Sequence, residues 1–373
     1  MHTSKRLFTP GPLNTTETVK AAMLCDMGSR DPEFLRVVRE IREQLLEIAG
    51  VADTFEAVLM QGSGTYVVES VISSAIPRNG KLLALVNGAY GRRIAQIAKI
   101  HGIDTVVLEL PENRKFTSAD VKQKLAETPG VTHVAVVHCE TTTGILNAIE
   151  EIGQVAADAG AVYFVDAMSS FGAVDIDFAA AKIDFLVSSA NKCIEGVPGF
   201  GFVLARRARL LELKGRARTL SMDLYAQWAG AVSDGQFRFT PPIQTLLAFH
   251  QALKEFKAEG GVASRSERYR SNHEVLMHGM RGLGFQTYLK PDDVSYIITT
   301  FRYLDDPKFT YEAFYERLSD RGFIIYAGKL TDEPCFRIGT IGQLYPKDME
   351  ALMENMRIVL EEMSVVIPSE AMR

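Results

Sequence analysis

The feature that most constrains the fold of this chain is an alternation, between about residues 56 and 205, of short apolar runs and longer amphipathic segments. The apolar runs are, in chain order, EAVLM, KLLALV, DTVVLEL, HVAVVH, AVYFVD, DFLVSS and GFVLAR. Continuous apolarity is typical of strands covered on both faces, and helices between such strands make crossovers that leave the strands parallel. The pattern predicts an α/β fold with a mostly parallel, seven-stranded sheet.

Helical segments fill two of the gaps between these runs. We expect helices in GTYVVESVISSAI, residues 64–76, and in AIEEIGQVAADAG, residues 148–160. The second segment ends at Gly160, a suitable C-cap, because glycine readily adopts the left-handed conformation that closes many helices.

Beyond about residue 240 the pattern changes and predicts a second, smaller domain. We expect a long helix over 243–261, strands in VSYIITTFRY and GFIIYAG, and a final helix with one apolar face that packs on a sheet. A chain of 373 residues is also too long for one ordinary core. We therefore predict an N-terminal arm (1–15), a large α/β domain (16–260) and a small α+β domain (261–373).

Composition narrows the possible classes of function. A net charge of −5 without long runs of like charge argues against a nucleic-acid partner. No apolar run approaches the roughly 20 residues that cross a bilayer, so we expect no membrane association. The four cysteines form no CxxC pair, as is typical of reduced thiols in the cytoplasm, and the seven histidines show no metal-ligand spacing. We expect a cytoplasmic protein without a metal site.

The loop QGSGTYVVE, which joins a predicted strand to a predicted helix, is the first candidate binding site. Its glycines let a ligand approach the backbone, Ser63 and Thr65 offer hydroxyls, and the N–H groups of the helix start favour an anion such as phosphate. The dinucleotide fingerprint would require a glycine at Val67, and a nucleoside-triphosphate loop would require Gly-Lys-Ser or Gly-Lys-Thr, so neither motif is present. The alternative is a tight turn with a Ser or Thr cap.

Two charged residues follow neighbouring apolar runs. Asp166 ends AVYFVD, and Lys192 follows DFLVSS by a few residues. Ligands of open parallel sheets bind outside the carboxyl ends of the strands, so both side chains should meet at one edge. A semi-buried lysine with a lowered pKa can attack a carbonyl, and a carboxylate can keep a ring nitrogen protonated. With the phosphate loop, these are the parts that pyridoxal 5′-phosphate requires, whereas separately a cap aspartate and a surface lysine remain alternatives.

Segments spread over nearly the whole chain are similar to motifs of one enzyme family. They are TPGPL, QGSGTYVVE, NGAYG, HCETTTGILN, VDAMSSFG, SSANKCIEGVPGFGF, SMDLYAQW, FRFTPP and FRIGTIG. By these segments the chain resembles the class V pyridoxal-phosphate aminotransferases of fold type I. The lysine loop and DLYAQW are most similar to the branch that acts on 2-aminoethylphosphonate and pyruvate, whereas MGSRDPEF at 27–34 is not typical of that branch.

The resemblance implies roles for individual residues. Lys192 would be the catalytic lysine that binds the cofactor covalently, and Asp166 would pair with the pyridine nitrogen. Further cofactor contacts are implied at Ser63, Gly64 and Thr65 (phosphate), Tyr90 (ring face), Thr141 (near the phenolic oxygen) and Thr240 (phosphate, from a second subunit). Arg337 would hold the acidic group of the substrate, and its apolar flanks require an anionic partner, structural or substrate. A homodimer with shared active sites is therefore implied.

The implied reaction is a ping-pong transamination in which 2-aminoethylphosphonate and pyruvate give phosphonoacetaldehyde and L-alanine. The nearest alternative is an alanine/serine–glyoxylate or serine–pyruvate aminotransferase of the same class. A cysteine desulfurase would need a nucleophilic cysteine on a mobile loop near the small domain, whereas Cys335 precedes a predicted strand and is expected to be buried. The alternative from another class is a non-catalytic ligand-binding scaffold, which would not need Lys192, Asp166 and Arg337 together.

Overall fold

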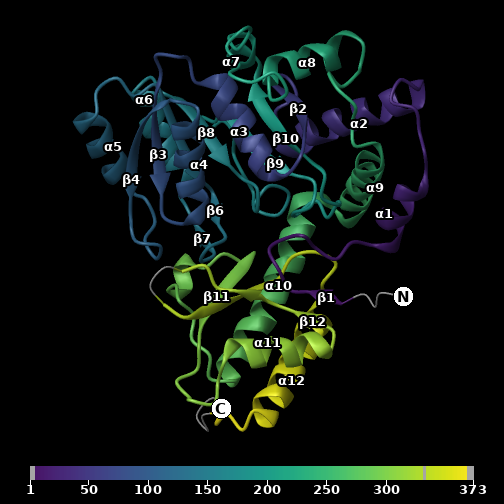
Figure 1. Ribbon diagram of the computed structural model, residues 1–373, viewed down its shortest axis with the longest axis vertical. Coiled ribbons are helices and arrows are strands. Elements are labelled where there is room, and N and C mark those ends of the chain that lie inside the picture. The colour runs from purple at the N-terminus through teal and green to yellow at the C-terminus, as the bar shows by residue number, and fades with distance from the viewer. Residues whose placement is uncertain (1–4, 331–332, 368–373) are drawn as a thin grey trace.

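The computed structural model describes residues 5–330 and 333–367, and these form two lobes (Figure 1). The wide lobe holds the large sheet, and the narrower lobe holds the C-terminal helices and the first strand of the chain. Residues 1–4 of the predicted arm, and 331–332 and 368–373 of the predicted small domain, lie outside the described residues.

The large lobe is built on a seven-stranded sheet in the order β2-β10-β9-β8-β5-β3-β4. Only β10 runs antiparallel to its neighbours β2 and β9, so the predicted mostly parallel sheet is confirmed, and each of the seven apolar runs forms one strand. The strands are β2 (Phe55–Gln61), β3 (Lys81–Val86), β4 (Asp104–Glu109), β5 (His133–Val137), β8 (Val162–Asp166), β9 (Phe185–Ser189) and β10 (Phe200–Arg206).

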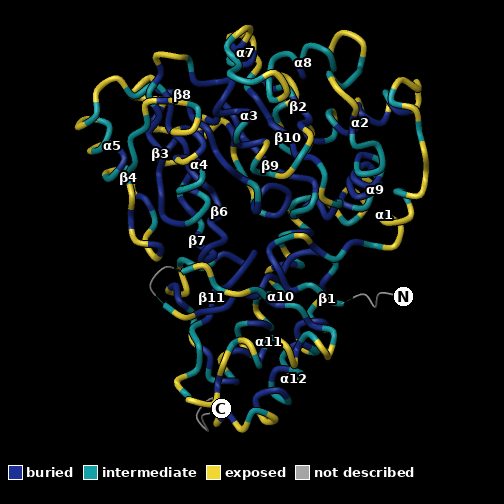
Figure 2. The backbone as a smooth tube through the Cα atoms, viewed as in Figure 1, coloured by how far each residue is buried: buried dark blue, intermediate teal, exposed yellow. Residues whose placement is uncertain are grey.

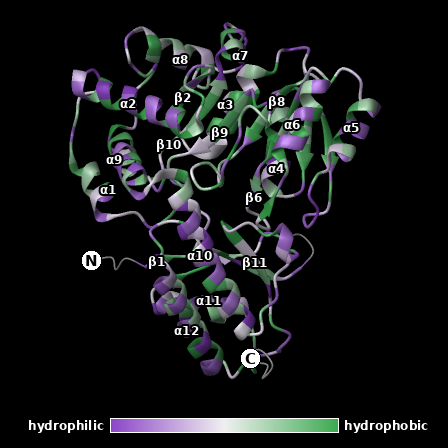
Figure 3. Cartoon of the chain, turned by 180° about the vertical axis from the view of Figure 1, so that it is seen from behind, coloured by the Kyte–Doolittle hydropathy of each residue, from purple (hydrophilic) through white to green (hydrophobic). Residues whose placement is uncertain are grey.

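The continuous apolarity of these strands follows from helices on both faces of the sheet. Along β5, Val134 and Val136 belong to one hydrophobic cluster, whereas Ala135 and Val137 belong to another on the opposite face. Burial of each large aliphatic side chain contributes roughly 1.5–3 kcal/mol. Figure 2 shows the strands as the buried centre of this lobe, and Figure 3 shows their hydrophobic character from behind.

Helices cover this sheet and continue the chain around it. They are α1 (Glu17–Ala21), α2 (Pro32–Ala49), α3 (Gly64–Ala75), α4 (Ala89–Ile100), α5 (Ser118–Glu127), α6 (Ile149–Asp158), α7 (Arg207–Leu211), α8 (Leu224–Ser233) and α9 (Ile243–Glu259), with a 3-10 turn at Ala22–Leu24 and a short hairpin, β6 (Cys139–Glu140) and β7 (Ile145–Leu146). The helices expected at 64–76 and 148–160 are thus α3 and α6. The C-cap of α6 is Ala159 and not the expected Gly160, which follows it with a left-handed φ of 69°.

The small lobe contains a three-stranded antiparallel sheet in the order β11-β14-β13. Strand β1 from the N-terminal arm pairs in parallel with β12, so the arm lies on this lobe. The final helix packs chiefly against two other helices and shares its hydrophobic cluster with sheet residues such as Phe336. The elements are β1 (Arg6–Leu7), α10 (Gly261–Gly282), a 3-10 turn (Pro291–Asp293), β11 (Ile298–Arg302), α11 (Tyr311–Asp320), β12 (Phe323–Ile324), β13 (Tyr326–Ala327), β14 (Cys335–Gly339) and α12 (Pro346–Glu362).

The two lobes are connected by α10, which begins beside the large lobe and continues into the small one (Figure 1). Gly260, with a left-handed φ of 111°, separates α9 from α10. We keep the domain limits of 1–15, 16–260 and 261–373 as a proposal. Among the described residues, no helix is both long and apolar enough to cross a membrane.

Candidate active site

A cavity of about 520 Å³ lies at the carboxyl ends of the sheet strands. Strands β5, β8 and β9 each end at it, and the arm contributes Pro12. Most of the residues that the sequence singled out line this cavity. They are Ser63, Gly64, Thr65, Tyr90, Thr141, Asp166 and Lys192.

The loop after β2 presents the start of α3 to the cavity. Gly62 has a φ of 106°, which favours glycine, and Ser63 is the N-cap but makes no side-chain cap bond. A Cβ on Gly64 would lie 2.6 Å from the Sδ atom of Met168, so a larger residue there would require the Met168 side chain to move. The N–H groups of this first turn lack intrahelical acceptors and therefore suit a phosphate.

Asp166 and Lys192 face the same cavity, as the sequence predicted. Asp166 ends β8, is 5% exposed and accepts a 2.9 Å hydrogen bond from the N–H of Met168. Burial raises the pKa of Asp166 to about 6. Lys192 follows β9, and its Nζ donates a 2.5 Å hydrogen bond to the carbonyl of Pro10. Burial lowers the pKa of Lys192, against the opposing effect of neighbours that include Asp166.

Tyr90 and Thr141 lie on another wall of the cavity, and a buried carboxylate that the sequence did not suggest fixes their backbone. Glu140 accepts hydrogen bonds from the N–H groups of Tyr90 and Gly91, at 3.2 and 3.1 Å, in the first turn of α4. It also accepts one from the hydroxyl of Thr142. A carboxylate at a helix N-terminus is favoured by the helix dipole, so Glu140 positions the turn that carries Tyr90.

Arg337, on β14 of the small lobe, is buried close to the cavity but does not line it. Its guanidinium donates to the carbonyl oxygens of Ala327 (3.0 Å) and Thr141 (2.8 Å). Within the described part of the chain, no Asp or Glu oxygen lies within 4.0 Å of the guanidinium, so no structural ion pair is seen at this charge. Burial lowers the pKa of Arg337.

Three segments singled out in the sequence lie away from the cavity lining. Thr240 is exposed, and its carbonyl accepts a 2.6 Å hydrogen bond from the Gln61 side chain. The DLYAQW motif forms the start of α8, where Asp223 caps the helix. The segment 27–34 leads into α2, where Asp31 is the N-cap. None of these three contributes a lining residue within this chain.

Sequence reasoning did not single out several lining residues, and two of them bear on how the cavity could hold a phosphate. Arg93, one turn into α4, donates a 3.2 Å hydrogen bond to the Thr65 hydroxyl and lies over the Tyr90 ring at 4.9 Å. Ser189, at the end of β9, has a buried hydroxyl oxygen without a hydrogen-bond partner. The sequence signal for Ser189 was its place at the end of an apolar run, three residues before Lys192.

The residues that line the cavity fit the parts of pyridoxal 5′-phosphate. The start of α3, Arg93 and the unpaired Ser189 hydroxyl suit a phosphate, and Asp166 and Lys192 suit the ring nitrogen and the aldehyde. Burial raises the pKa of Cys139, which also lines the cavity, to about 12, so this thiol stays protonated. Cys335, the cysteine considered as a possible desulfurase nucleophile, is 4% exposed, which confirms its expected burial.

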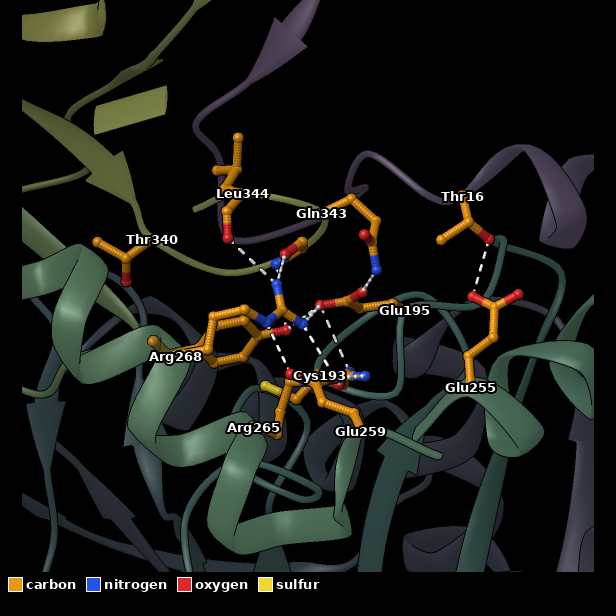
Figure 4. A network of polar contacts seen from close by, with 12 residues as sticks. Thr16, Cys193, Glu195, Glu255, Glu259, Arg265, Arg268, Thr340, Gln343 and Leu344 are labelled. Atoms are coloured by element: carbon orange, nitrogen blue, oxygen red, sulfur yellow. Dashed lines mark hydrogen bonds and ion pairs between the residues drawn. The ribbon is translucent and has the colours of Figure 1, made fainter. Parts of the chain in front are cut away.

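A buried polar network ties the loop of Lys192 to the small lobe (Figure 4). Glu195 has a left-handed φ of 64° and is 3% exposed. Its carboxylate accepts hydrogen bonds from Arg268 (2.8 Å) and Tyr269 (2.5 Å) of α10, and from Gln343, which follows β14. Arg265 of α10 also donates to the carbonyl of Cys193, next to Lys192. The network therefore connects the lysine loop to α10 and to the segment that follows β14, the strand of Arg337.

A mostly parallel seven-stranded sheet, with a lysine and an aspartate in one cavity at its carboxyl edge, defines a pyridoxal-phosphate enzyme of fold type I. The match to one family is more specific: the model of the aminotransferase class-V family covers residues 16–344. The chain belongs to the class V aminotransferases.

Named relatives agree with this family, and a solved structure agrees with the fold. The chain is 50% identical over 349 residues, 93% of its length and 95% of the relative's, to a 2-aminoethylphosphonate–pyruvate transaminase of Klebsiella pneumoniae. It shows the same identity and coverage to a protein of that name from Vibrio vulnificus. A pyridoxamine–pyruvate aminotransferase from Mesorhizobium loti superimposes with a TM-score of 0.90 at 22% identity, over 99% of this chain and 95% of the other, which shows a shared fold.

Proposed function

We propose that this chain transfers the amino group of 2-aminoethylphosphonate to pyruvate, forming phosphonoacetaldehyde and L-alanine. The observation that carries this proposal is the 50% identity, over 93% of the chain, to transaminases named for these substrates. These relatives favour the phosphonate reaction over the alanine/serine–glyoxylate alternative. The lysine and aspartate at the cavity count against a non-catalytic scaffold.

Bound pyridoxal 5′-phosphate would supply an electron sink for the carbanion that forms when the substrate loses its proton. Lys192 would hold the cofactor covalently and, once released, carry that proton, because its lowered pKa favours the neutral amine that a base requires. Asp166 is ionised at neutral pH, since its raised pKa of about 6 still lies below 7. Its negative charge would stabilise a proton on the ring nitrogen.

Other side chains would orient the cofactor and the substrates. Ser63, Gly64 and Thr65 would bind the phosphate, with Tyr90 beside the ring and Thr141 near its phenolic oxygen. Arg337 would hold the acidic group of each substrate in turn. Its planar, permanently charged guanidinium can grip both a phosphonate and a carboxylate through paired hydrogen bonds.

The proposal includes a homodimer with shared active sites. Thr240 is exposed and lies outside the cavity of its own chain, and exposed apolar side chains occur nearby at Phe239 and Leu220. A dimer that mixes a Lys192→Ala chain with a Thr240→Ala chain tests this arrangement. If Thr240 acts across the interface, one site in the mixed dimer is fully native and binds cofactor with wild-type affinity. If it acts within its own chain, no native site remains.

A cytoplasmic location is also part of the proposal. It is supported by the four free cysteines, because disulfides are rare in that reducing compartment.

The reaction is tested by incubating purified holoenzyme with single amino donors and keto acids and following the products. We expect L-alanine to form from 2-aminoethylphosphonate and pyruvate. Activity with L-serine or L-alanine plus glyoxylate, together with none on the phosphonate, would establish the alternative instead. Protein that stays colourless with added cofactor would favour the scaffold.

A further inference from the structure

A lysine of the small lobe reaches the edge of the active-site cavity. Lys329 lies between β13 and β14, and its Nζ is 3.3 Å from the hydroxyl of Tyr90 and 5.0 Å from the centre of the Tyr90 ring. Tyr90 belongs to α4 of the large lobe and lines the cavity. The side chain of Lys329 therefore bridges the two lobes beside the cavity, although it is itself exposed.

The backbone holds Lys329 close to Arg337. In the antiparallel pair of β13 and β14, Tyr326 lies opposite Arg337, and the Arg337 side chain donates to the carbonyl of Ala327. The next residue, Gly328, donates from its N–H to the carbonyl of Cys335 at 3.0 Å. A Cβ on Gly328 would collide with the Cys335 backbone, so glycine lets this segment lie directly on β14. Lys329 therefore leaves the sheet beside the strand that carries Arg337.

Lys329 and Arg337 resemble each other in having neutral contacts within the described part of the chain. Among the described residues, neither Lys329 nor Arg337 has an acidic oxygen within 4.0 Å. Their contacts are neutral: a phenol for Lys329 and two backbone carbonyls for Arg337. Tyr90 lies close to both charges. Against the effect of burial, Thr141, Lys192 and Lys329 lower the pKa of Tyr90, and Tyr90 in turn opposes the lowering of the Arg337 pKa by burial. Two positive charges thus lie on one side of the cavity, and no carboxylate of residues 5–330 and 333–367 forms an ion pair with either of them.

The two proposed substrates differ in charge. A carboxylate carries one negative charge, whereas a phosphonate, like a phosphate, has a second ionisable oxygen and approaches two negative charges near neutral pH. One arginine balances the carboxylate of pyruvate but leaves part of the phosphonate charge unbalanced. A second cation at the cavity edge would complete the neutralisation, and its exposure lets it return to water or to Tyr90 when the monoanionic substrate binds.

We propose that Lys329 is a specificity-determining residue that binds the phosphonate group together with Arg337. On binding, its ammonium would leave the Tyr90 hydroxyl and donate to a phosphonate oxygen. This inference rests on the proposed function, and it assigns the proposed preference for phosphonate donors to a named side chain. The DLYAQW motif does not explain that preference, because it lies outside the cavity lining.

The test compares two ligands that carry the same ethyl group on different acids and have no amine. Ethylphosphonate and propionate are titrated into wild-type holoenzyme, Lys329→Met, and Lys122→Met, whose exposed lysine lies on α5 and not at the cavity. We expect Lys329→Met to bind ethylphosphonate about 10- to 100-fold more weakly, the effect of losing a hydrogen bond between charged groups. Propionate binding should change less than about threefold, and Lys122→Met should match wild type.

Kinetics give an independent readout. In Lys329→Met, KM for 2-aminoethylphosphonate should rise by the same factor with little change in kcat, and KM for pyruvate should stay near wild type. Lys329→Arg should recover most of the phosphonate affinity because it restores the charge. The ratio of the ethylphosphonate affinities of wild type and Lys329→Met should also increase with pH, because ethylphosphonate loses its second proton. A purely structural role of Lys329 would not produce this pH dependence.

The outcomes are distinguishable. One outcome is that wild type transaminates 2-aminoethylphosphonate while Lys329→Met weakens the binding of both ligands equally, or of neither. In that case the specificity role proposed for Lys329 is wrong and the proposed function stands. If wild type shows no activity with the phosphonate, the proposed function fails and this inference fails with it.

Discussion

The Nζ atom of Lys192 lies 2.5 Å from the carbonyl oxygen of Pro10, a residue 182 positions earlier in the chain. The neighbouring Gly11 makes this contact possible, because a Cβ there would lie 2.7 Å from the same nitrogen. The N-terminal arm therefore forms part of the environment of the proposed catalytic lysine, and the space beside Lys192 depends on one glycine.

Gly11→Ala should displace Lys192 and reduce covalent cofactor binding, because the new methyl group would overlap the lysine side chain. The measurement is the fraction of protein that retains cofactor after borohydride reduction. Gly102→Ala is the matched control: Gly102 also has a positive φ, of 65°, but a Cβ added there would meet no atom within 4 Å. Both changes introduce backbone strain, of about 1 kcal/mol at the left-handed angle of Gly102 and more at Gly11, whose φ is 123°. Equal cofactor retention in the two variants would contradict the steric explanation.

Lys192→Ala should abolish the visible absorption of covalently held cofactor and lower transamination by at least about 10³-fold, since both attachment and proton transfer depend on this amine. Absorption spectra and single-turnover rates provide the measurement. Lys122→Ala removes an exposed lysine on α5 and should leave both unchanged. A wild-type spectrum in Lys192→Ala would show that another amine holds the cofactor.

Asp166→Asn should stabilise the cofactor-free protein in a pH-dependent way. The pKa of Asp166 is raised, chiefly by burial, from 3.8 to about 6, so its ionisation opposes folding. Below about pH 4 this cost is absent, and above about pH 6 it is complete and amounts to roughly 3 kcal/mol. Urea unfolding at pH 5 and pH 8 should show a larger advantage of the variant over wild type at pH 8. An advantage that does not change with pH would contradict the raised pKa.

Arg337→Ala should raise KM for 2-aminoethylphosphonate and for pyruvate by about 100-fold each, because both acids would lose a charged hydrogen-bonding partner. Steady-state kinetics measure the effect, and an unchanged cofactor spectrum shows that the cavity is intact. Arg337→Lys should recover little, since an ammonium cannot also reach the carbonyls of Ala327 and Thr141. A normal KM for either substrate would remove Arg337 from that half of the reaction.

Glu195→Ala should lower the free energy of unfolding by about 3–5 kcal/mol, because it leaves the buried charges of Arg265 and Arg268 without one of their acidic partners. Denaturant unfolding provides the measurement. Glu17→Ala removes an exposed ion pair with Lys20 and should leave the midpoint unchanged. A Glu195 variant as stable as wild type would show that the network contributes little to holding the lobes together.

Much of the site was predictable because its residues follow strands that can be recognised from neighbouring residues in the sequence. Asp166 and Lys192 come after continuous apolar runs, and the carboxyl ends of parallel strands must meet at one edge. The glycines around Ser63 predicted a strand-to-helix turn because they lie between an apolar run and a helical segment. Each of these predictions needed only the neighbouring residues in the sequence.

Other parts of the site could not be predicted in this way. Glu140, Arg93 and Lys329 occur in segments whose patterns suggest only a loop or a helix, and their positions at the cavity depend on how distant elements pack. Arg337 was expected to need an anion, but two backbone carbonyls satisfy part of its guanidinium instead. Thr240 was assigned to the phosphate of a second subunit; it lies outside the cavity of its own chain, and this assignment stays a prediction.

The sequence by itself determined the sheet, since a run of consecutive apolar residues is stable only where both faces of a strand are covered. It also determined which strand ends carry the amine and the acid. Only the tertiary structure decided that Pro10 contacts Lys192, that Glu195 joins the lysine loop to α10, and that Lys329 reaches Tyr90 across the lobes. The reason is physical: hydrophobic periodicity is a property of neighbouring residues, whereas the direction of a polar side chain depends on partners far away in the chain.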